Sequence, residues 1–300
     1  MNFKKELEQK TEQMEAVLKQ YLPLEEGYAK KVIEAMNYSI LAGGKRLRPM
    51  LMWETAALFG DAGEMIKPFM AALEMIHNYS LVHDDLPAMD NDEYRRGRKT
   101  THVVYGEGMA VLAGDGLLNY AFETAASAFD MANAPEDYHK IGRAIQVLAG
   151  KAGIYGMIGG QCADLNAEEA EGEISEEMLL YIHEHKTAAL IQAAMMIGAI
   201  LTGASDEEIA DVEKCAYNIG IAFQIQDDIL DVTGSQEVLG KPIGSDEKNH
   251  KLTYVSMHGL KESKEQVEEL SKEAVSILTS FPKRNLFLEQ LVEQLIYREK

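Results

Sequence analysis

No proline occurs between Pro135 and Pro242, a stretch of 106 residues that is rich in Ala, Leu, Ile, Met and Glu. A proline inside a helix removes a hydrogen bond and clashes with the preceding turn, whereas these residue types favour helix. Apolar residues recur in the stretch at spacings of three and four, as Leu179 and Ile182 illustrate, and sustained two-residue alternation is hard to find. The sequence therefore predicts an all-α protein.

The organisation of the chain indicates one large helical bundle. We find no Gly/Ser linker, internal repeat or low-complexity segment that would divide the 300 residues. We therefore expect residues 1–300 to form a single domain of on the order of ten helices, given ordinary helix and loop lengths. The longest apolar run, Ala188 to Leu201, is interrupted only by Gln192. It is too short to span a bilayer and predicts a central buried helix.

Charge and cysteine content exclude several classes of partner. The formal net charge of −20 argues against nucleic acid and against an anionic membrane surface, because both require dense Lys/Arg. Cys162 and Cys215 lie far apart and form no CxxC pair, which is typical of a reduced protein. Residues Met1 to Gln20 contain no apolar signal-peptide core. We therefore expect a cytoplasmic protein with no nucleic-acid partner and no stable membrane anchoring.

Two aspartate clusters follow apolar helical stretches. The first extends from His83 to Asp92, and the second from Phe223 to Asp231. Asp227 and Asp231 are four residues apart, which places both on one face of a helix. Such a concentration of carboxylates is unfavourable unless a cation neutralises it, and Mg2+ accepts one or two carboxylates plus substrate phosphates. Two solvated acidic faces are the alternative, but the apolar surroundings of both clusters favour a metal site.

Two basic clusters stand out in this acidic chain. Lys45, Arg46 and Arg48 follow a Gly-Gly pair, and a second cluster follows the first aspartates: Arg95, Arg96, Arg98 and Lys99. Arg binds phosphate oxygens through two parallel hydrogen bonds, and Lys supplies a point charge. Each cluster by itself is also consistent with a solvated surface patch. Combined with the aspartates, the clusters predict a diphosphate held by Mg2+ on one side and by cationic side chains on the other.

These motifs together resemble the trans isoprenyl diphosphate synthases, most closely the bacterial farnesyl diphosphate synthases. The resemblance spans almost the whole chain and rests on Gly43-Gly44-Lys45-Arg46-Leu47-Arg48-Pro49, the first aspartate motif with its two-residue insertion, Arg95-Arg96-Gly97, Gly159-Gly160-Gln161, Lys186-Thr187, the second aspartate motif and Gly240-Lys241-Pro242. It implies an all-α bundle around a central cavity, three Mg2+ ions in each active site and a homodimer.

The resemblance also implies a role for each matching residue. Asp84 and Asp90 would bind two Mg2+ ions and Asp227 a third, with support from Asp85, Asp228 and Asp231. The allylic diphosphate would be held by Arg95, Lys186, Thr187, Gln224 and Lys241, among which Lys186, Thr187 and Gln224 are the expected catalytic residues. Isopentenyl diphosphate would be held by Gly44, Lys45, Arg48, His77 and Arg96.

The implied reaction condenses isopentenyl diphosphate with dimethylallyl and then geranyl diphosphate, giving (2E,6E)-farnesyl diphosphate and diphosphate. A hydroxyl at Thr187, inside an expected helix, can bend the backbone there. Tyr79 lies five residues before Asp84, where the family places an aromatic residue for fifteen-carbon products, while Ser80 projects along the Asp84 face. The alternatives are a geranylgeranyl diphosphate synthase, a terpene cyclase, a non-catalytic partner subunit and a metallophosphatase.

Overall fold

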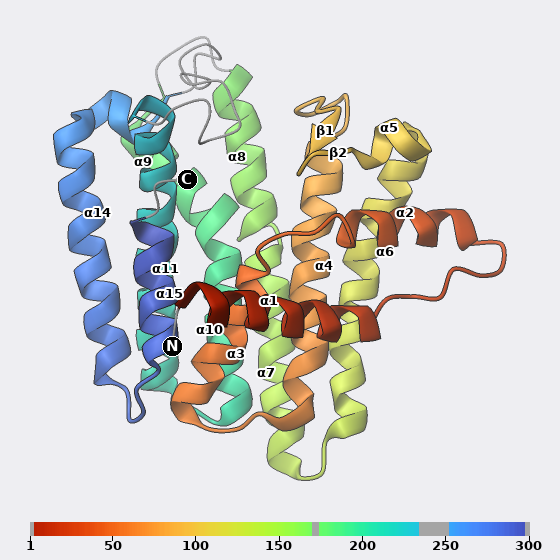
Figure 1. Ribbon diagram of the computed structural model, residues 1–300, viewed down its shortest axis with the longest axis horizontal. Helices are drawn as coiled ribbons and strands as arrows, with labels where there is room; N and C mark the ends of the chain where they lie inside the picture. Colours follow the sequence, from red (N-terminus) through yellow and green to blue (C-terminus); the bar gives the residue numbers. More distant parts are fainter. Residues whose placement is uncertain (1–2, 170–173, 234–251, 298–300) are drawn as a thin grey trace. The chain divides into compact units, whose positions relative to one another are not determined.

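The computed structural model describes residues 3–169, 174–233 and 252–297 (Figure 1). The chain forms two compact units, the first made of Met1–Trp53 and Ala62–Ile145 and the second of Glu54–Asp61 and Gln146–Lys300. The expected all-α fold is confirmed, because the strands in the described ranges are two short segments, β1 (Tyr94–Arg95) and β2 (Arg98–Lys99). None of the described helices is long and apolar enough to cross a membrane.

The first unit is built around the helix α4 (Ile66–Asp84). This helix is apolar on all sides and is buried over most of its length, as expected for a core helix. It packs against α6 (Glu107–Ala126), which presents small residues such as Ala110 and Gly114. The other elements of the unit are α1 (Phe3–Gln20), α2 (Lys30–Ile40), the first part of α3 (Leu47–Phe59), η1 (Gly63–Met65), α5 (Thr101–Tyr105), η2 (Ser127–Met131) and the first part of α7 (Pro135–Ala152).

The second unit contains the central buried helix that the sequence predicts. Every residue of α10 (Ala189–Thr202) up to Leu201 is buried, and the polar Gln192 accepts a hydrogen bond from Lys151 at 2.5 Å. This helix packs against α11 (Asp206–Thr233), which in turn packs against α14 (Tyr254–Ser280). The remaining elements are α8 (Met157–Glu169), α9 (Glu176–Ile182), η3 (His183–Ala188) and α15 (Leu286–Ile296).

Helix ends follow the local chemistry of the sequence. Pro49 lies in the first turn of α3, where proline needs no hydrogen-bond partner. Ser205 caps α11: its hydroxyl accepts from the backbone nitrogen of Glu208 at 3.2 Å, and the Glu208 carboxylate accepts from the Ser205 nitrogen at 2.7 Å. The loop that we expect from Thr233 to Thr253 lies largely outside the described residues.

Candidate functional site

The first aspartate motif lies at the carboxyl end of α4. Asp84 is the last residue of the helix, and both Asp84 and Asp85 are buried. The following turn folds back on the helix, because the backbone nitrogen of Asp90 donates to the carbonyl oxygen of Asp84 at 2.8 Å and that of Asn91 donates to Leu86 at 3.1 Å. The two-residue insertion therefore brings the backbone of Asp90 back to that of Asp84, which is compatible with the predicted metal site.

The chemistry of this motif fits a divalent cation. The carboxyl end of a helix carries partial negative charge, so buried carboxylates there need positive charge nearby. Burial raises the pKa of Asp85, and Arg95, whose Nε donates to Asp85 at 2.6 Å, opposes that shift. Within the described residues no three His, Cys, Asp or Glu side chains form a ready-made metal cage. Mg2+ commonly takes one or two carboxylates and completes its shell with water and phosphate oxygens. Asp84 and Asp90 could supply such a pair.

The hairpin of β1 and β2 carries the two arginines that follow the motif. Its turn consists of Arg96 and Gly97, whose φ angles are 52° and 73°. A two-residue turn of this kind needs positive φ at both positions and usually contains Asn-Gly, so Arg96 adopts a backbone conformation that is unfavourable for its type. Such strain is concentrated at functional sites. Arg96 donates to the carbonyl oxygen of Gly43, which ties the hairpin to the Gly-Gly turn.

Arg48, His77 and Arg96 lie close enough in the first unit to interact electrostatically, and we call them the cationic cluster. The pKa of His77 is lowered well below 6.5, first by burial and then by the positive charges of Arg48 and Arg96. The Arg48 Nε is buried and has no hydrogen-bond partner within the described ranges. A Cβ at Gly44 would lie 2.7 Å from an Arg96 nitrogen, so the arginine occupies the space that the glycine leaves. Lys45, which follows Gly44 in the sequence, is exposed.

The cationic cluster is electrostatically suited to an anion. Without one, its cations repel each other: the pKa of Arg48 is lowered by burial and by Arg96, although Glu74 partly offsets this. Burial is likewise the first cause of the lowered pKa of Arg96. A bound diphosphate would relieve the repulsion and satisfy the Arg48 donor. The structure thus brings together Gly44, Arg48, His77 and Arg96, four of the residues that the family resemblance assigns to isopentenyl diphosphate.

Two residues of the basic clusters are held by contacts within the protein, and in Arg46 these contacts replace the anion-binding role that the cluster suggests. Arg46 is buried; its Nε donates to Glu15 at 2.6 Å, and its Nη1 donates to Glu74 at 2.7 Å. Arg98 stacks over the ring of Tyr38, with 4.4 Å between the guanidinium carbon and the ring centroid. The two carboxylates neutralise Arg46, whereas the Tyr38 ring and the Leu41 carbonyl oxygen hold Arg98 in place without neutralising it.

In the second unit, two of the three predicted catalytic residues, Lys186 and Thr187, lie on one irregular helical turn. The residues of η3 form a π-helix between α9 and α10, so the expected distortion at Thr187 is present. Its hydroxyl donates to the Gln224 Oε1 at 2.8 Å rather than bonding back to its own helix. Lys186 forms an ion pair with Asp164 of α8. Asp164 is a residue that our sequence analysis missed, although its position three residues after Gln161 places it on that motif's helix face.

Glycines allow the π-helix to pack closely against its neighbours. A Cβ at Gly160 of α8 would overlap the backbone nitrogen of Lys186, and a Cβ at Gly220 of α11 would overlap the Ala188 side chain. Both α8 and α11 contact η3. The Gly-Gly-Gln motif therefore allows α8 to lie close to the backbone of the turn that carries Lys186 and Thr187.

The second aspartate motif occupies the last turns of α11. Gln224, Asp227 and Asp231 recur at spacings of three and four and share one helix face, on which Asp227 is exposed. Asp228 is buried instead, and its carboxylate accepts from the backbone nitrogen of Tyr254 at 2.8 Å. Asp228 thereby satisfies a donor at the start of α14. The predicted ligand Lys241 lies outside the described residues.

Comparison with known proteins identifies the family. A family model described as polyprenyl synthetase matches residues 29–284. The farnesyl diphosphate synthase of Geobacillus stearothermophilus is 44% identical over 87% of this chain and 86% of its own length. The geranylgeranyl diphosphate synthase of Cyanophora paradoxa is 44% identical over 89% of this chain and 87% of its own. A solved structure, the geranyltransferase from Helicobacter pylori complexed with magnesium and isoprenyl diphosphate, has a TM-score of 0.80 at 31% identity and covers 99% of this chain and 97% of its own.

The chain therefore belongs to the polyprenyl synthetase family. It is a trans-prenyltransferase of the magnesium-dependent isoprenyl diphosphate synthases. The comparisons name both farnesyl and geranylgeranyl diphosphate synthases and leave the product open.

Proposed function

We propose that this enzyme makes (2E,6E)-farnesyl diphosphate by adding isopentenyl diphosphate to dimethylallyl and then to geranyl diphosphate. The observation that supports a fifteen-carbon product is the position of Tyr79. It lies five residues before Asp84, about 7.5 Å toward the start of α4. The side chain is buried, and its ring meets that of His83 edge to face at 5.8 Å between centroids.

The surroundings of Tyr79 fit a rigid floor for the growing hydrocarbon. His83 holds the ring from the α6 side, since the His83 Nε2 lies 3.1 Å from the Val111 carbonyl oxygen. Burial and then the charge of Asp84 raise the pKa of Tyr79 to about 12, so the phenol stays neutral. Ser80 is smaller and donates to the carbonyl oxygen of His77 at 2.9 Å. A bulky, uncharged ring below the aspartates would stop elongation there.

We expect Tyr79→Ala to shift the main product from fifteen carbons to twenty or more, with condensation preserved, because the removed ring opens the path along α4. Tyr79→Phe is the matched control, since it keeps the ring and should keep the fifteen-carbon product. Chromatography of the dephosphorylated products measures chain length. A Tyr79→Ala enzyme that still stops at fifteen carbons would place the floor elsewhere. A wild-type enzyme that releases mainly twenty carbons would favour the geranylgeranyl alternative.

We assign the steps of the reaction to residues on this basis. Bound Mg2+ supplies positive charge to the leaving diphosphate, and three ions per site, with Asp84 and Asp90 holding two and Asp227 a third, follow from the family resemblance. Arg95 and Lys186 hold the allylic diphosphate as its C–O bond breaks. The hydrogen-bonded Thr187 and Gln224 orient their dipoles toward the allylic cation. The double bond of isopentenyl diphosphate attacks that cation, and the released diphosphate accepts the proton that is lost.

The cationic cluster should contribute to the affinity for isopentenyl diphosphate more than to the affinity for the allylic substrate. We expect Arg48→Ala or His77→Ala to raise the KM for isopentenyl diphosphate about 10- to 100-fold and to change the allylic KM less, because one charge-assisted contact is worth about 1.5–3 kcal/mol. Lys241→Ala should raise the allylic KM more than the KM for isopentenyl diphosphate. Steady-state kinetics with each substrate varied in turn measures both values. Arg284→Ala is the control, because it removes an exposed arginine that is paired with Glu289. Equal changes in the two KM values would contradict the assignment of these basic residues to different substrates.

We also propose a homodimer, located in the cytoplasm, whose chain folds as one domain. The family match spans both compact units and so supports a single domain. Four exposed apolar side chains on α5 and α6 support association: Val103, Val104, Val111 and Leu112. Monomers rarely leave such groups exposed together. Sedimentation of only a 33.3 kDa species at assay concentration would contradict the dimer.

A further inference from the structure

The β1–β2 hairpin carries Arg95 and Arg96 but cannot fix its own position. It has two paired residues in each strand, and an isolated hairpin of this size is not stable in water. On one side, Arg95 pairs with Asp85 at the end of α4. On the other side, the hairpin meets the end of α2 and the turn that follows it.

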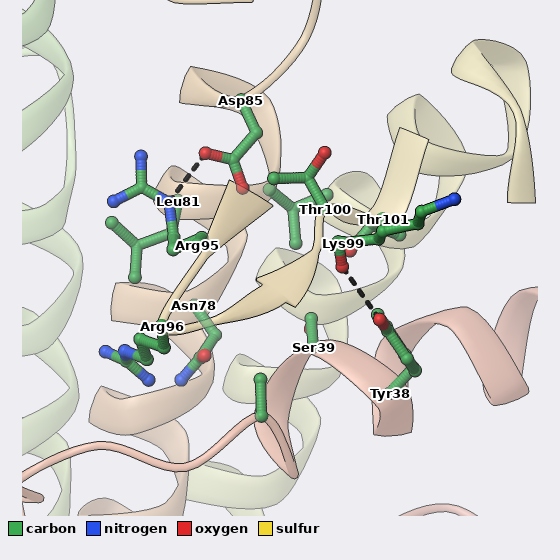
Figure 2. Close-up of a pocket in the computed structure, with 12 residues that line it drawn as sticks. Tyr38, Ser39, Asn78, Leu81, Asp85, Arg95, Arg96, Lys99, Thr100 and Thr101 are labelled. Atoms are coloured by element: carbon green, nitrogen blue, oxygen red, sulfur yellow. Dashed lines mark hydrogen bonds and ion pairs between the residues drawn. The ribbon is translucent and has the colours of Figure 1, made fainter. Parts of the chain in front are cut away.

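Tyr38 of α2 makes two of the contacts on this second side. Its hydroxyl donates to the carbonyl oxygen of Lys99 at 2.7 Å, as Figure 2 shows. Its ring supports the Arg98 guanidinium at 4.4 Å, and Arg98 also donates to the Leu41 carbonyl oxygen at 3.1 Å. The ring of Tyr105 packs edge to face against Tyr38 at 5.5 Å between centroids. Tyr38 is thereby held between α5 and the hairpin.

The contacts of Tyr38 to β2 help to determine where Arg96 lies. In the register of the hairpin, Lys99 pairs with Tyr94 and Arg98 with Arg95. Fixing β2 therefore fixes β1 and the turn at Arg96 between them. A cavity of about 30 Å³, which is large enough for water, lies beneath the hairpin (Figure 2). Because this space interrupts the packing, the hairpin depends on its few directed contacts.

We propose that Tyr38 is a positioning residue for prenyl transfer, whose hydroxyl and ring hold the β1–β2 hairpin so that Arg96 reaches the diphosphate at the cationic cluster. Tyr38 itself touches neither substrate nor metal in this assignment. It acts through Lys99 and Arg98. The inference rests on the proposed role of Arg96 in binding isopentenyl diphosphate.

Tyr38→Phe tests the hydroxyl contact without removing the ring. We expect the KM for isopentenyl diphosphate to rise about five- to tenfold, the size expected for one lost hydrogen bond, while kcat changes less than twofold. The allylic KM should change less, because Arg95 keeps its pair with Asp85. Tyr28→Phe is the matched control, since Tyr28 is fully exposed. An unchanged KM in Tyr38→Phe, together with a raised KM in Arg96→Ala, would overturn the inference.

A double-mutant cycle separates a positioning role from a general structural one. If Tyr38 acts through Arg96, then Tyr38→Phe should have no further effect on the KM for isopentenyl diphosphate in an Arg96→Ala enzyme. The same increase in both backgrounds would show that Tyr38 acts by another route and would overturn the inference. An Arg96→Ala enzyme with an unchanged KM would contradict the proposed role of Arg96, and this inference with it.

Discussion

Asp84→Ala and Asp227→Ala are each expected to lower kcat about a thousandfold while leaving the helical fold intact. Each change removes a carboxylate whose charge would help to hold Mg2+, and the metal's stabilisation of a leaving group is worth several kcal/mol, or about three powers of ten in rate. Turnover at saturating Mg2+ measures the effect on catalysis, and circular dichroism measures helix content.

The control for these variants is Asp211→Ala. Asp211 is an exposed carboxylate near the start of α11, the helix whose last turns carry Asp227. The control changes net charge by the same amount and should leave kcat unchanged. Near-native turnover in Asp84→Ala or Asp227→Ala at saturating Mg2+ would show that the metal assignment is wrong for that residue.

Gly160→Ala is expected to lower kcat at least about a hundredfold. The added methyl would overlap the backbone of Lys186, so α8 and the π-helix must separate, and overpacking of this kind costs about 1–3 kcal/mol of folding free energy. The separation displaces Lys186 and Thr187, and small displacements of catalytic groups can cost about two powers of ten in rate. Single-turnover kinetics and thermal unfolding together measure both effects.

Gly150→Ala is the matched control for this prediction. Gly150 lies in α7, and a Cβ there would meet nothing within 4 Å, so alanine should be tolerated and has the higher helix propensity. A wild-type kcat in Gly160→Ala would show that the close packing of α8 does not position the π-helix that carries Lys186 and Thr187.

Local signals in the sequence were sufficient for the fold class and for the position of most motifs. The proline-free stretch contains the buried helix α10, and Pro49 and Ser205 mark helix starts as expected. The aspartate motifs end helices beside the core. These features depend on hydrogen bonds and apolar spacing within one or two helical turns, so residues that are neighbours in sequence contain the necessary information.

The roles of individual charged residues depend on partners that are distant in sequence. Arg46 and Arg48 are two residues apart and look equivalent, yet Arg46 is neutralised by Glu15 and Glu74, while the Arg48 Nε has no partner in the described part of the chain. Asp228 accepts from Tyr254, whereas Asp227 is exposed beside it.

The sequence by itself therefore determined an all-α prenyltransferase, its helix ends and its aspartate and arginine motifs. The tertiary structure decided which of those charges have partners within the protein, where glycines let the π-helix pack closely, and that Tyr38 contacts the hairpin 61 residues further along the chain. The reason is that internal partners decide how much of each charge can face a ligand, and such partners come from whichever elements pack against the residue.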